Sequence, residues 1–316
     1  MEKLRTNHIS IAALASAGVL WGLTVPLSKL ALPWLAPAWL TVIRFLIAGP
    51  ILALIGRRGL RDALRPSVAG AGAFGFGGVL ILQNAGIART SVSHAALLIG
   101  AVPVLVALIA AARGQASRRP LIWLGYALAL IGIALVAGAG GGGSSGQGDL
   151  LVLGSAVLSA LFIYGQPRLL GGRDPAAVTA VQFAAGLLVA LPVALLTEPT
   201  PAASTSSGSL AAVLSLSLLG TALPFWLFAY GQSKVSARLA GAYVNLEPVV
   251  GVAVGWAAFD NPATAVQIVG ALGVLFGIVL SGLPSESESE GVSGGEEGRR
   301  STGRRPILSW RPAAGS

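Results

Sequence analysis

Ten continuous apolar runs, each about as long as a membrane-spanning helix, limit what this chain can fold into. A helix needs about 20 residues to cross a hydrocarbon core of about 30 Å. Hydrophobic residues make up 54% of the 316 residues and charged residues only 10%, against about 25% charged in an ordinary soluble domain. These numbers exclude a soluble enzyme, a disordered protein and a coiled coil, and predict an all-α integral membrane protein with ten transmembrane helices. Pro, Gly and Arg separate the runs, which lie at residues 9–32, 37–56, 68–88, 91–112, 121–139, 150–170, 176–197, 210–232, 236–259 and 265–283.

The basic residues predict the orientation of these helices. If the N-terminus is cytoplasmic, every Lys and Arg except Lys29, Arg44 and Arg89 falls on the cytoplasmic side. Cytoplasmic loops of membrane proteins carry such an excess of Lys and Arg. The sequence therefore predicts a multi-pass protein of the cell membrane (plasma or inner membrane) with both termini cytoplasmic. The net charge of +9 then reflects loops that meet an anionic lipid leaflet, so no nucleic-acid partner is expected.

The two halves of the chain match each other. Ser16-Ala17 aligns with Ser155-Ala156 at an offset of 139, and Thr41 and Phe45 align with Thr179 and Phe183 at an offset of 138. Without a gap, an offset of 145 then relates the next three segments. Its matched pairs are Gly75 and Gly220, Gly86 and Gly231, Ser91 and Ser236, Ala95 and Ala240, Pro103-Val104 and Pro248-Val249, Gly125 and Gly270, and Gly132-Ile133 and Gly277-Ile278.

An odd number of helices in each half has a topological consequence. Five helices bring the chain to the opposite face, so the second half enters the membrane inverted with respect to the first. Inverted repeats are typical of secondary transporters, whose substrate site lies near the midplane where the halves meet. The predicted parts are a cytoplasmic N-terminus (1–8), a first repeat (9–139), a Gly-rich external linker (140–149), a second repeat (150–283) and a disordered cytoplasmic tail (284–316).

Several short motifs, taken in order, resemble one known family. They are Trp21-Gly22 with Lys29, Arg44, Thr90-Ser91-Val92-Ser93-His94-Ala95-Ala96 leading to Pro103, and Ser236-Ala237-Arg238 leading to Leu246-Glu247-Pro248-Val249. Across roughly residues 9–283 the chain resembles the EamA-type branch of the drug/metabolite transporter superfamily. The resemblance implies ten helices in two inverted repeats and export or facilitated movement of small metabolites. One departure is that Gly114-Gln115 and Phe259-Asp260 stand where that family often has Gly-Glu, which argues against a role for a carboxylate in those loops.

Three charged residues lie within the apolar runs, where a charge at the bilayer centre costs about 2.5–3.5 kcal/mol on insertion scales. Glu247 is the acidic residue at mid-segment and is the candidate for proton or cation coupling; the alternative is a structural role at the kink beside Pro248. Arg44 and Lys29 can attract an anionic group. Alternatively, Arg44 holds neighbouring carbonyl groups and Lys29 extends to the membrane interface.

Two prolines predict matched helix breaks, because proline removes a helical hydrogen bond. Pro103 and Pro248 occupy equivalent positions in the two halves. Paired breaks of this kind indicate a binding cavity between the halves, although a simple bend is the alternative. Tyr243 lies one turn from Glu247, and a break at Pro248 would let Asn245 share its side of the helix.

Aromatic and amide side chains supply the remaining candidates for a cavity wall, which usually combines apolar surface with a few hydrogen-bonding groups. They are Trp21, Tyr164, Trp226 and Tyr230, with Gln83 and Asn84 for hydrogen bonds. Separately, Gly18-x-x-x-Gly22, Gly251-x-x-x-Gly255 and Gly273-x-x-x-Gly277 allow close helix contact, either within a monomer or across a homodimer.

The residue types available within the apolar runs distinguish between the possible classes of function. A membrane-embedded enzyme needs a cluster of Asp, Glu, His, Cys or Ser, which two His, no Cys and one deep carboxylate do not supply. We therefore expect no enzyme, metal or cofactor. The leading interpretation is a secondary transporter for small metabolites, with amino acids and drug-like amphipathic compounds as candidate substrates and proton coupling as an option. The alternative is a structural or signalling membrane protein without transport activity.

Overall fold

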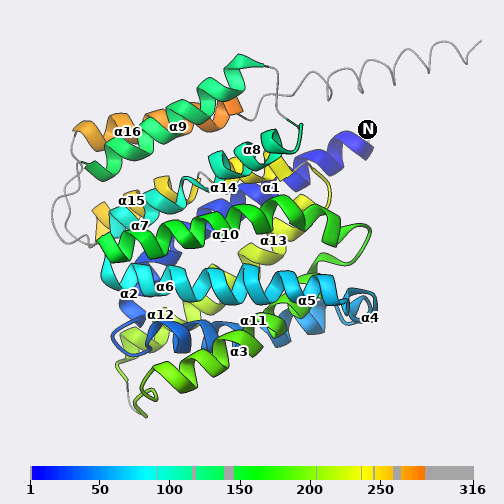
Figure 1. Cartoon of the computed structure of the whole chain (residues 1–316), viewed down its shortest axis with the longest axis vertical. Coiled ribbons are helices and arrows are strands. Elements are labelled where there is room, and N and C mark those ends of the chain that lie inside the picture. The colour runs from blue at the N-terminus through cyan, green and yellow to red at the C-terminus, as the bar shows by residue number, and fades with distance from the viewer. Residues whose placement is uncertain are drawn as a thin grey trace, which may run out of the picture.

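The computed structural model describes residues 2–90, 92–115, 119–138, 146–203, 205–235, 237–244, 246–258 and 265–281. Throughout these ranges the regular structure is helical (Figure 1). The helices are α1 Glu2–Trp21, α2 Thr24–Ala31, α3 Pro37–Ile55, α4 Leu60–Ala63, α5 Pro66–Gly72, η1 Ala73–Gly78, α6 Val79–Arg89, α7 Val92–Ile99, α8 Val102–Ala112, α9 Pro120–Gly138, α10 Gly146–Leu170, α11 Pro175–Thr197, α12 Ser207–Ser217, η2 Leu218–Ala222, α13 Leu223–Gln232, α14 Ala237–Val244, α15 Leu246–Ala258 and α16 Ala265–Ser281.

The chain is an all-helical membrane protein. Within the described ranges, six helical stretches are long and apolar enough to cross a bilayer, and further apolar helices are shorter. The six stretches are His8–Ala31, Pro37–Ile55, Pro66–Arg89, Gly146–Leu170, Pro175–Thr197 and Ser207–Gln232. Large apolar side chains on their outer surfaces are exposed, as a lipid-facing surface requires. The other four predicted segments fall on α7–α8, α9, α14–α15 and α16.

Several helix boundaries differ from the sequence-based expectation. The first segment is interrupted after Trp21, where the hydroxyl of Thr24 donates to the Trp21 carbonyl oxygen at 2.7 Å. α10 begins at Gly146 rather than at residue 150, so it takes in part of the segment predicted as linker. The length of an apolar run does not fix the ends of its helix, because Gly and Ser are tolerated in membrane helices.

The interrupted helices follow the repeat. α7 ends at Ile99 and α8 begins at Val102, just before Pro103. In the second half α14 ends at Val244 and α15 begins at Leu246, just before Pro248. The π-helical segments η1 and η2 also begin at equivalent positions, because the offset of 145 relates Ala73 to Leu218. π-Helical turns inside α-helices frequently lie at functional sites, and the pairing of η1 with η2 is a structural counterpart of the sequence repeat.

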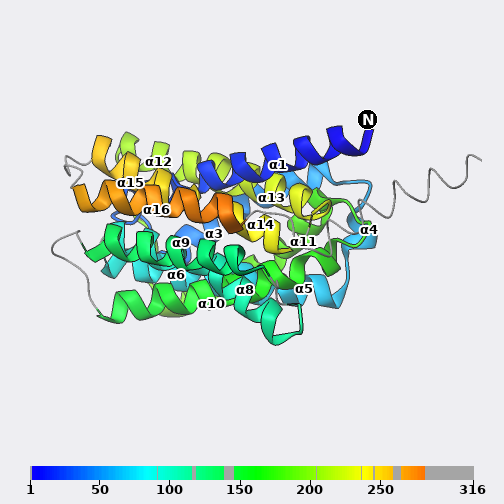
Figure 2. The ribbon, with the colours of Figure 1, turned by 90° about the horizontal axis from the view of Figure 1, so that it is seen from above.

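Each half packs its third segment against the first segment of the other half. A Cβ on Gly86 of α6 would collide with Val152 of α10, and one on Gly231 of α13 would lie 2.7 Å from Leu14 Cδ2 of α1. The two contacts are equivalent, because an offset of 138 relates Leu14 to Val152. Figure 2 shows the result: α1 lies in the layer of α12–α16, and α10 lies in the layer of α5–α9.

These contacts correct the alignment of the first segments. The sequence match related them by an offset of 139, whereas the contacts made by Gly75 and Gly220 give an offset of 138. A Cβ on Gly75 would meet the Phe162 ring, and a Cβ on Gly220 would meet Thr24 Cγ2. Ser-Ala pairs are too common in membrane helices to fix a register by themselves.

Hydrogen bonds at the two ends of the bundle fix the relative directions of the first segments. At one end Lys29 Nζ donates to the Thr90 carbonyl at 2.7 Å, and Thr90 Oγ1 bonds Asp149 Oδ1 at 2.6 Å. There the stretch His8–Ala31 ends and α10 begins. At the other end, Arg173 after α10 donates to the Asp62 carbonyl of α4 at 3.2 Å. The first and sixth segments therefore run in opposite directions, as Figure 1 shows.

The glycine motifs proposed for close helix contact pack within one molecule. Gly18 and Gly22 lie against Tyr243 and Val250, and Gly251 approaches the Gly22 carbonyl. Gly273 and Gly277 lie against α9 at Gly132 and Gly125. Of the two options that the sequence left open, the structure shows the one within a monomer for these glycines. Gly255 lies among the residues whose surroundings the structure leaves undescribed.

Candidate functional site

A cavity lies between the two halves, and its lining residues come from α1–α3, η1, α6–α8, α10 and α13–α15. It encloses about 780 Å³ of space between side chains, including the part open to solvent. Both halves contribute to its wall. The lining residues are Trp21, Thr24, Ser28, Arg44, Gly75, Phe76, Val79, Leu80, Gln83, Asn84, Ile87, Ile99, Val102, Ser155, Ala156, Ser159, Phe162, Ile163, Phe225, Phe228, Val244 and Glu247.

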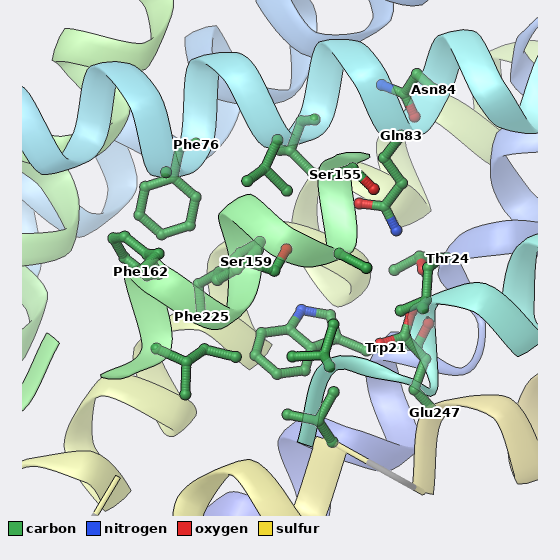
Figure 3. A pocket seen from close by; sticks show the side chains of 18 of the residues that line it. Trp21, Thr24, Phe76, Gln83, Asn84, Ser155, Ser159, Phe162, Phe225 and Glu247 are labelled. Atoms are coloured by element: carbon green, nitrogen blue, oxygen red, sulfur yellow. Dashed lines mark hydrogen bonds between the residues drawn. The ribbon is translucent and has the colours of Figure 1, made fainter. Parts of the chain in front are cut away.

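The cavity has a polar end and an aromatic end (Figure 3). Gln83, Ser155 and Glu247 lie toward one end, while Phe162 and Phe225 lie toward the other. The aromatic end continues into a packed cluster in which the Phe76 ring lies 4.7 Å from Phe162 and 4.7 Å from Phe225, measured between centroids. Pockets that combine apolar surface with a few placed polar groups fix the orientation of an amphipathic ligand. This wall can therefore hold a solute with one polar and one apolar part.

Two polar groups on the wall have no protein partner among the described residues. They are Nε1 of Trp21 and Oγ of Ser28, and both side chains are at most 8% exposed. A buried donor without a partner costs about 1–3 kcal/mol. Trp21 is held by Phe225 and Phe228, whose ring centroids lie 4.9 and 4.8 Å from that of Trp21. A hydrogen-bonding solute in the cavity would satisfy these two groups.

Glu247 and Arg44 bring opposite charges to the same cavity. Glu247 is 5% exposed and Arg44 is 3% exposed. No hydrogen bond or ion pair of the Glu247 carboxylate to another described residue is present, and its charge interacts with that of Arg44. A charged group buried in a membrane helix marks a functional site unless a partner neutralises it directly. The Glu247 carboxylate is thus available to a cation or a proton.

Arg44 is anchored on the π-helical segment of the second half. Its Nε donates to Thr221 Oγ1 at 2.8 Å, and its Nη2 donates to the Gly220 carbonyl at 3.4 Å. A π-helical segment leaves backbone carbonyls without the usual helical donor. η2 therefore positions the guanidinium group, and Arg44 both holds a carbonyl and faces the cavity.

The structure brings five of the sequence-predicted residues to the cavity wall: Trp21, Arg44, Gln83, Asn84 and Glu247. Asn84 uses its amide nitrogen to bond Thr41 Oγ1 at 3.0 Å, which ties α6 to α3. The side chain of Gln83 points into the cavity (Figure 3).

Other candidates lie away from this wall. Tyr164 is directed to Gln115, with 3.2 Å between its hydroxyl and Gln115 Oε1. Trp226 packs on the cluster around Phe45 and Phe183, and neither Tyr230, Tyr243, Pro103 nor Pro248 is among the lining residues. Lys29 lies at the end of the bundle, where its Nζ donates to the Thr90 carbonyl oxygen. Asn245 falls outside the described residues.

Sequence reasoning missed the serines and phenylalanines of the wall. The offset of 138 relates Trp21 to Ser159 and Thr24 to Phe162. This offset, applied to the candidate Trp21, would have indicated Ser159, whereas Thr24, the partner of Phe162, was not among the sequence candidates. Composition alone gave no reason to choose Phe162 over Tyr164 on the same helix.

Comparisons with known proteins agree with this architecture. The model of the EamA-like transporter family matches the chain twice, at residues 8–138 and 146–283. The "Probable terminal-alkyne amino-acid exporter" of Streptantibioticus cattleyicolor is 28% identical over 277 residues, covering 86% of this chain and 92% of that protein. The "Uncharacterized inner membrane transporter YedA" of Escherichia coli K12 is 28% identical over 280 residues, covering 85% of this chain and 89% of that protein.

A solved structure shares the fold. A chain described as "Crystal structure of protein" superposes with a TM-score of 0.73 at 21% identity, covering 86% of this chain and 96% of the other. At that identity the likeness supports the fold alone. The family model, in contrast, covers both halves of the helical bundle. The chain therefore belongs to the EamA-like transporter family; it is a multi-pass membrane transporter with a small-molecule substrate, not an enzyme.

Proposed function

We propose that this protein moves small amphipathic solutes, amino acids among them, across the cell membrane by alternating access. In this proposal ten helices cross the bilayer as two inverted five-helix repeats, with both termini cytoplasmic. The unlike directions of α1 and α10 and the paired breaks before Pro103 and Pro248 support the inverted arrangement. Opposed repeats around a central site are the usual architecture of secondary transporters.

The observation that carries the substrate proposal is the set of unsatisfied groups on one cavity wall. The Trp21 Nε1 group is an unpaired donor and the Ser28 hydroxyl is unpaired among the described residues. Glu247 and Arg44 supply one charge of each sign. A zwitterionic solute places its ammonium group at the Glu247 carboxylate and its carboxylate toward Arg44, while its apolar part lies against Phe162 and Phe225. The printed name of the Streptantibioticus relative, "Probable terminal-alkyne amino-acid exporter", fits this division of the wall, because a terminal alkyne is apolar and the amino-acid part is zwitterionic.

Glu247 is also our candidate for coupling to a proton gradient. Burial disfavours the charged form of a carboxyl group, so proton binding and cation binding compete at this side chain. A carboxyl group that exchanges a proton for a substrate ammonium couples the two movements in opposite directions. This is the arrangement expected of an exporter driven by the proton gradient.

Flux in reconstituted vesicles tests the proposal. Purified protein in liposomes is given labelled phenylalanine, leucine, glutamate and a sugar phosphate, and we expect the apolar zwitterions to move faster than the other two. Trp21→Phe keeps one six-membered aromatic ring and removes the indole N–H, which should weaken apparent affinity about 2- to 10-fold, because one neutral hydrogen bond contributes about 0.5–1.5 kcal/mol. Trp123→Phe, on α9 beside Tyr126, is the matched control. Flux no greater than in empty liposomes for all four solutes would favour the structural or signalling alternative.

A further inference from the structure

Three residues of the cavity wall have glutamines as their repeat partners, and these glutamines are buried in the other half of the bundle. The offset of 138 relates Ser28 to Gln166 and Arg44 to Gln182, and the offset of 145 relates Ile87 to Gln232. All three glutamines are at most 2% exposed, and none lines the cavity described above. They lie toward the opposite end of the bundle, since α10 and α13 end there.

We propose that Gln166, Gln182 and Gln232 line the cytoplasmic half of the solute path when the protein faces the other way. The inference rests on the proposed alternating access, in which each half adopts the conformation that the other half had. The wall positions Ser28, Arg44 and Ile87 are then closed, and their repeat partners open to the cytoplasm. Neutral amides both donate and accept hydrogen bonds, so this part of the path suits a polar zwitterion.

Gln232 is the side chain that most needs such an explanation. Its Nε2 donates to the carbonyl oxygen of Ile163 at 3.1 Å. Pro167, four residues later on α10, has no N–H to bond that carbonyl, so Gln232 replaces the missing helical donor. Its Oε1, however, is buried without a partner among the described residues. Replacing the missing N–H of Pro167 requires only the amide nitrogen of Gln232. The unsatisfied amide oxygen indicates that this side chain bonds another group in a different conformation.

The side-chain amides of the other two glutamines, Gln166 and Gln182, bond each other. Gln182 Nε2 donates to Gln166 Oε1 at 2.8 Å, and Gln166 Nε2 donates to Gln182 Oε1 at 3.1 Å. Gly72 of α5 lies against the Gln182 backbone, with no room for a Cβ. In the described conformation the two amides therefore satisfy each other, and each can instead bond a solute once α10 and α11 move apart.

The absence of cysteine from the chain makes the test direct. Single variants Gln232→Cys and Ile87→Cys are placed in vesicles of known orientation and exposed to a membrane-impermeant methanethiosulfonate on one face at a time. Ala190→Cys is the matched control, because Ala190 and its repeat partner Leu52 are both buried and neither lines the cavity. Gln166→Cys with Ser28→Cys forms a second pair, in case Gln232→Cys does not fold by size-exclusion chromatography.

We expect Ile87→Cys to react from the external face and Gln232→Cys from the cytoplasmic face, each about tenfold faster than Ala190→Cys, which reacts only through local opening. In the double variant, blocking Ile87→Cys from outside with a bulky maleimide should hold that side open and slow the reaction of Gln232→Cys. Labelling of Gln232→Cys that is unaffected by the block would show a permanent crevice and overturn the proposal. Labelling no faster than that of Ala190→Cys, in vesicles that still transport an amino acid, would also overturn it while leaving the proposed function intact.

Discussion

The carboxylate of Glu198, at the end of α11, accepts hydrogen bonds from the backbone N–H of Ala38 at 2.9 and 3.0 Å. Trp39 donates its N–H to the same carboxylate at 3.0 Å. α3 has no capping side chain of its own at Ala36, whereas α11 is capped by Asp174 from its own half. The second half therefore supplies the cap that the first half lacks.

Glu198→Ala should lower the free energy of unfolding by about 1–2 kcal/mol, because it removes an N-terminal cap and a charge favourable to the helix dipole. Thermal unfolding in detergent measures the change. Glu198→Gln keeps one acceptor oxygen and should lose less stability. Equal effects of the two variants would contradict the capping role.

The repeat shows which parts of the fold could be predicted from the sequence. The segments were predictable because apolar length is a local property, and the matched prolines because proline acts on its own helix. The exchange of α1 and α10 between layers was not predictable, since it depends on which distant surfaces fit. The sequence matched Gly86 with Gly231 through the repeat, but it did not indicate that these glycines pack against Val152 and Leu14.

Some residues of the candidate site could likewise be predicted from the sequence, and others could not. Glu247 and Arg44 stand out in the sequence because charges within apolar runs are rare. Which aromatic residue faces the cavity depends on helix rotation of about 100° per residue. Tyr164 follows Phe162 by two positions, so it lies on the opposite side of α10. The sequence identifies the aromatic residues of a helix but does not show which side of the helix faces the cavity.

The close contact at Gly231 predicts a specific sensitivity to added volume. Gly231→Ala should destabilise the protein by about 1–3 kcal/mol, because its Cβ would lie 2.7 Å from Leu14 Cδ2, and overpacking forces neighbours to shift. Gly70→Ala is the matched control, since nothing lies within 4 Å of its Cβ. Unfolding temperature in detergent is the measurement. Adding Leu14→Ala should restore part of the loss in Gly231→Ala, and a double variant as unstable as the sum of the two single variants would contradict this interpretation.

Glu247→Gln tests proton coupling. The amide is nearly the same size as the carboxyl group but binds no proton near neutral pH, so folding and surface level should be retained while flux becomes insensitive to an imposed pH gradient. Substrate flux in vesicles at several gradients, with wild type and variant side by side, is the measurement. Glu198→Gln serves as a control acid outside the cavity and should keep the gradient dependence. A well-folded Glu247→Gln that keeps the wild-type dependence would leave a facilitator without proton coupling.

Topology is tested with tags. A tag at the C-terminus or within residues 57–67 should be cytoplasmic, and one near Gly143 should be external, because five helices separate the linker from either end. Protease protection in oriented vesicles reads out each tag. Finding the tag near Gly143 on the same side as the C-terminal tag would refute the inverted repeat.

The packing of α6 on α10 and of α13 on α1 has a consequence for how the protein is made. When the first half leaves the ribosome, the Gly86 face of α6 has no partner until α10 has been inserted, and α1 waits longer still for Gly231. Neither half can complete its core during synthesis. The order of insertion thus leaves the Gly86 face of α6 facing lipid, or a membrane chaperone, until α10 is inserted, and the Leu14 face of α1 until α13 is inserted. Expressed as separate polypeptides, the halves should be degraded singly and accumulate only together.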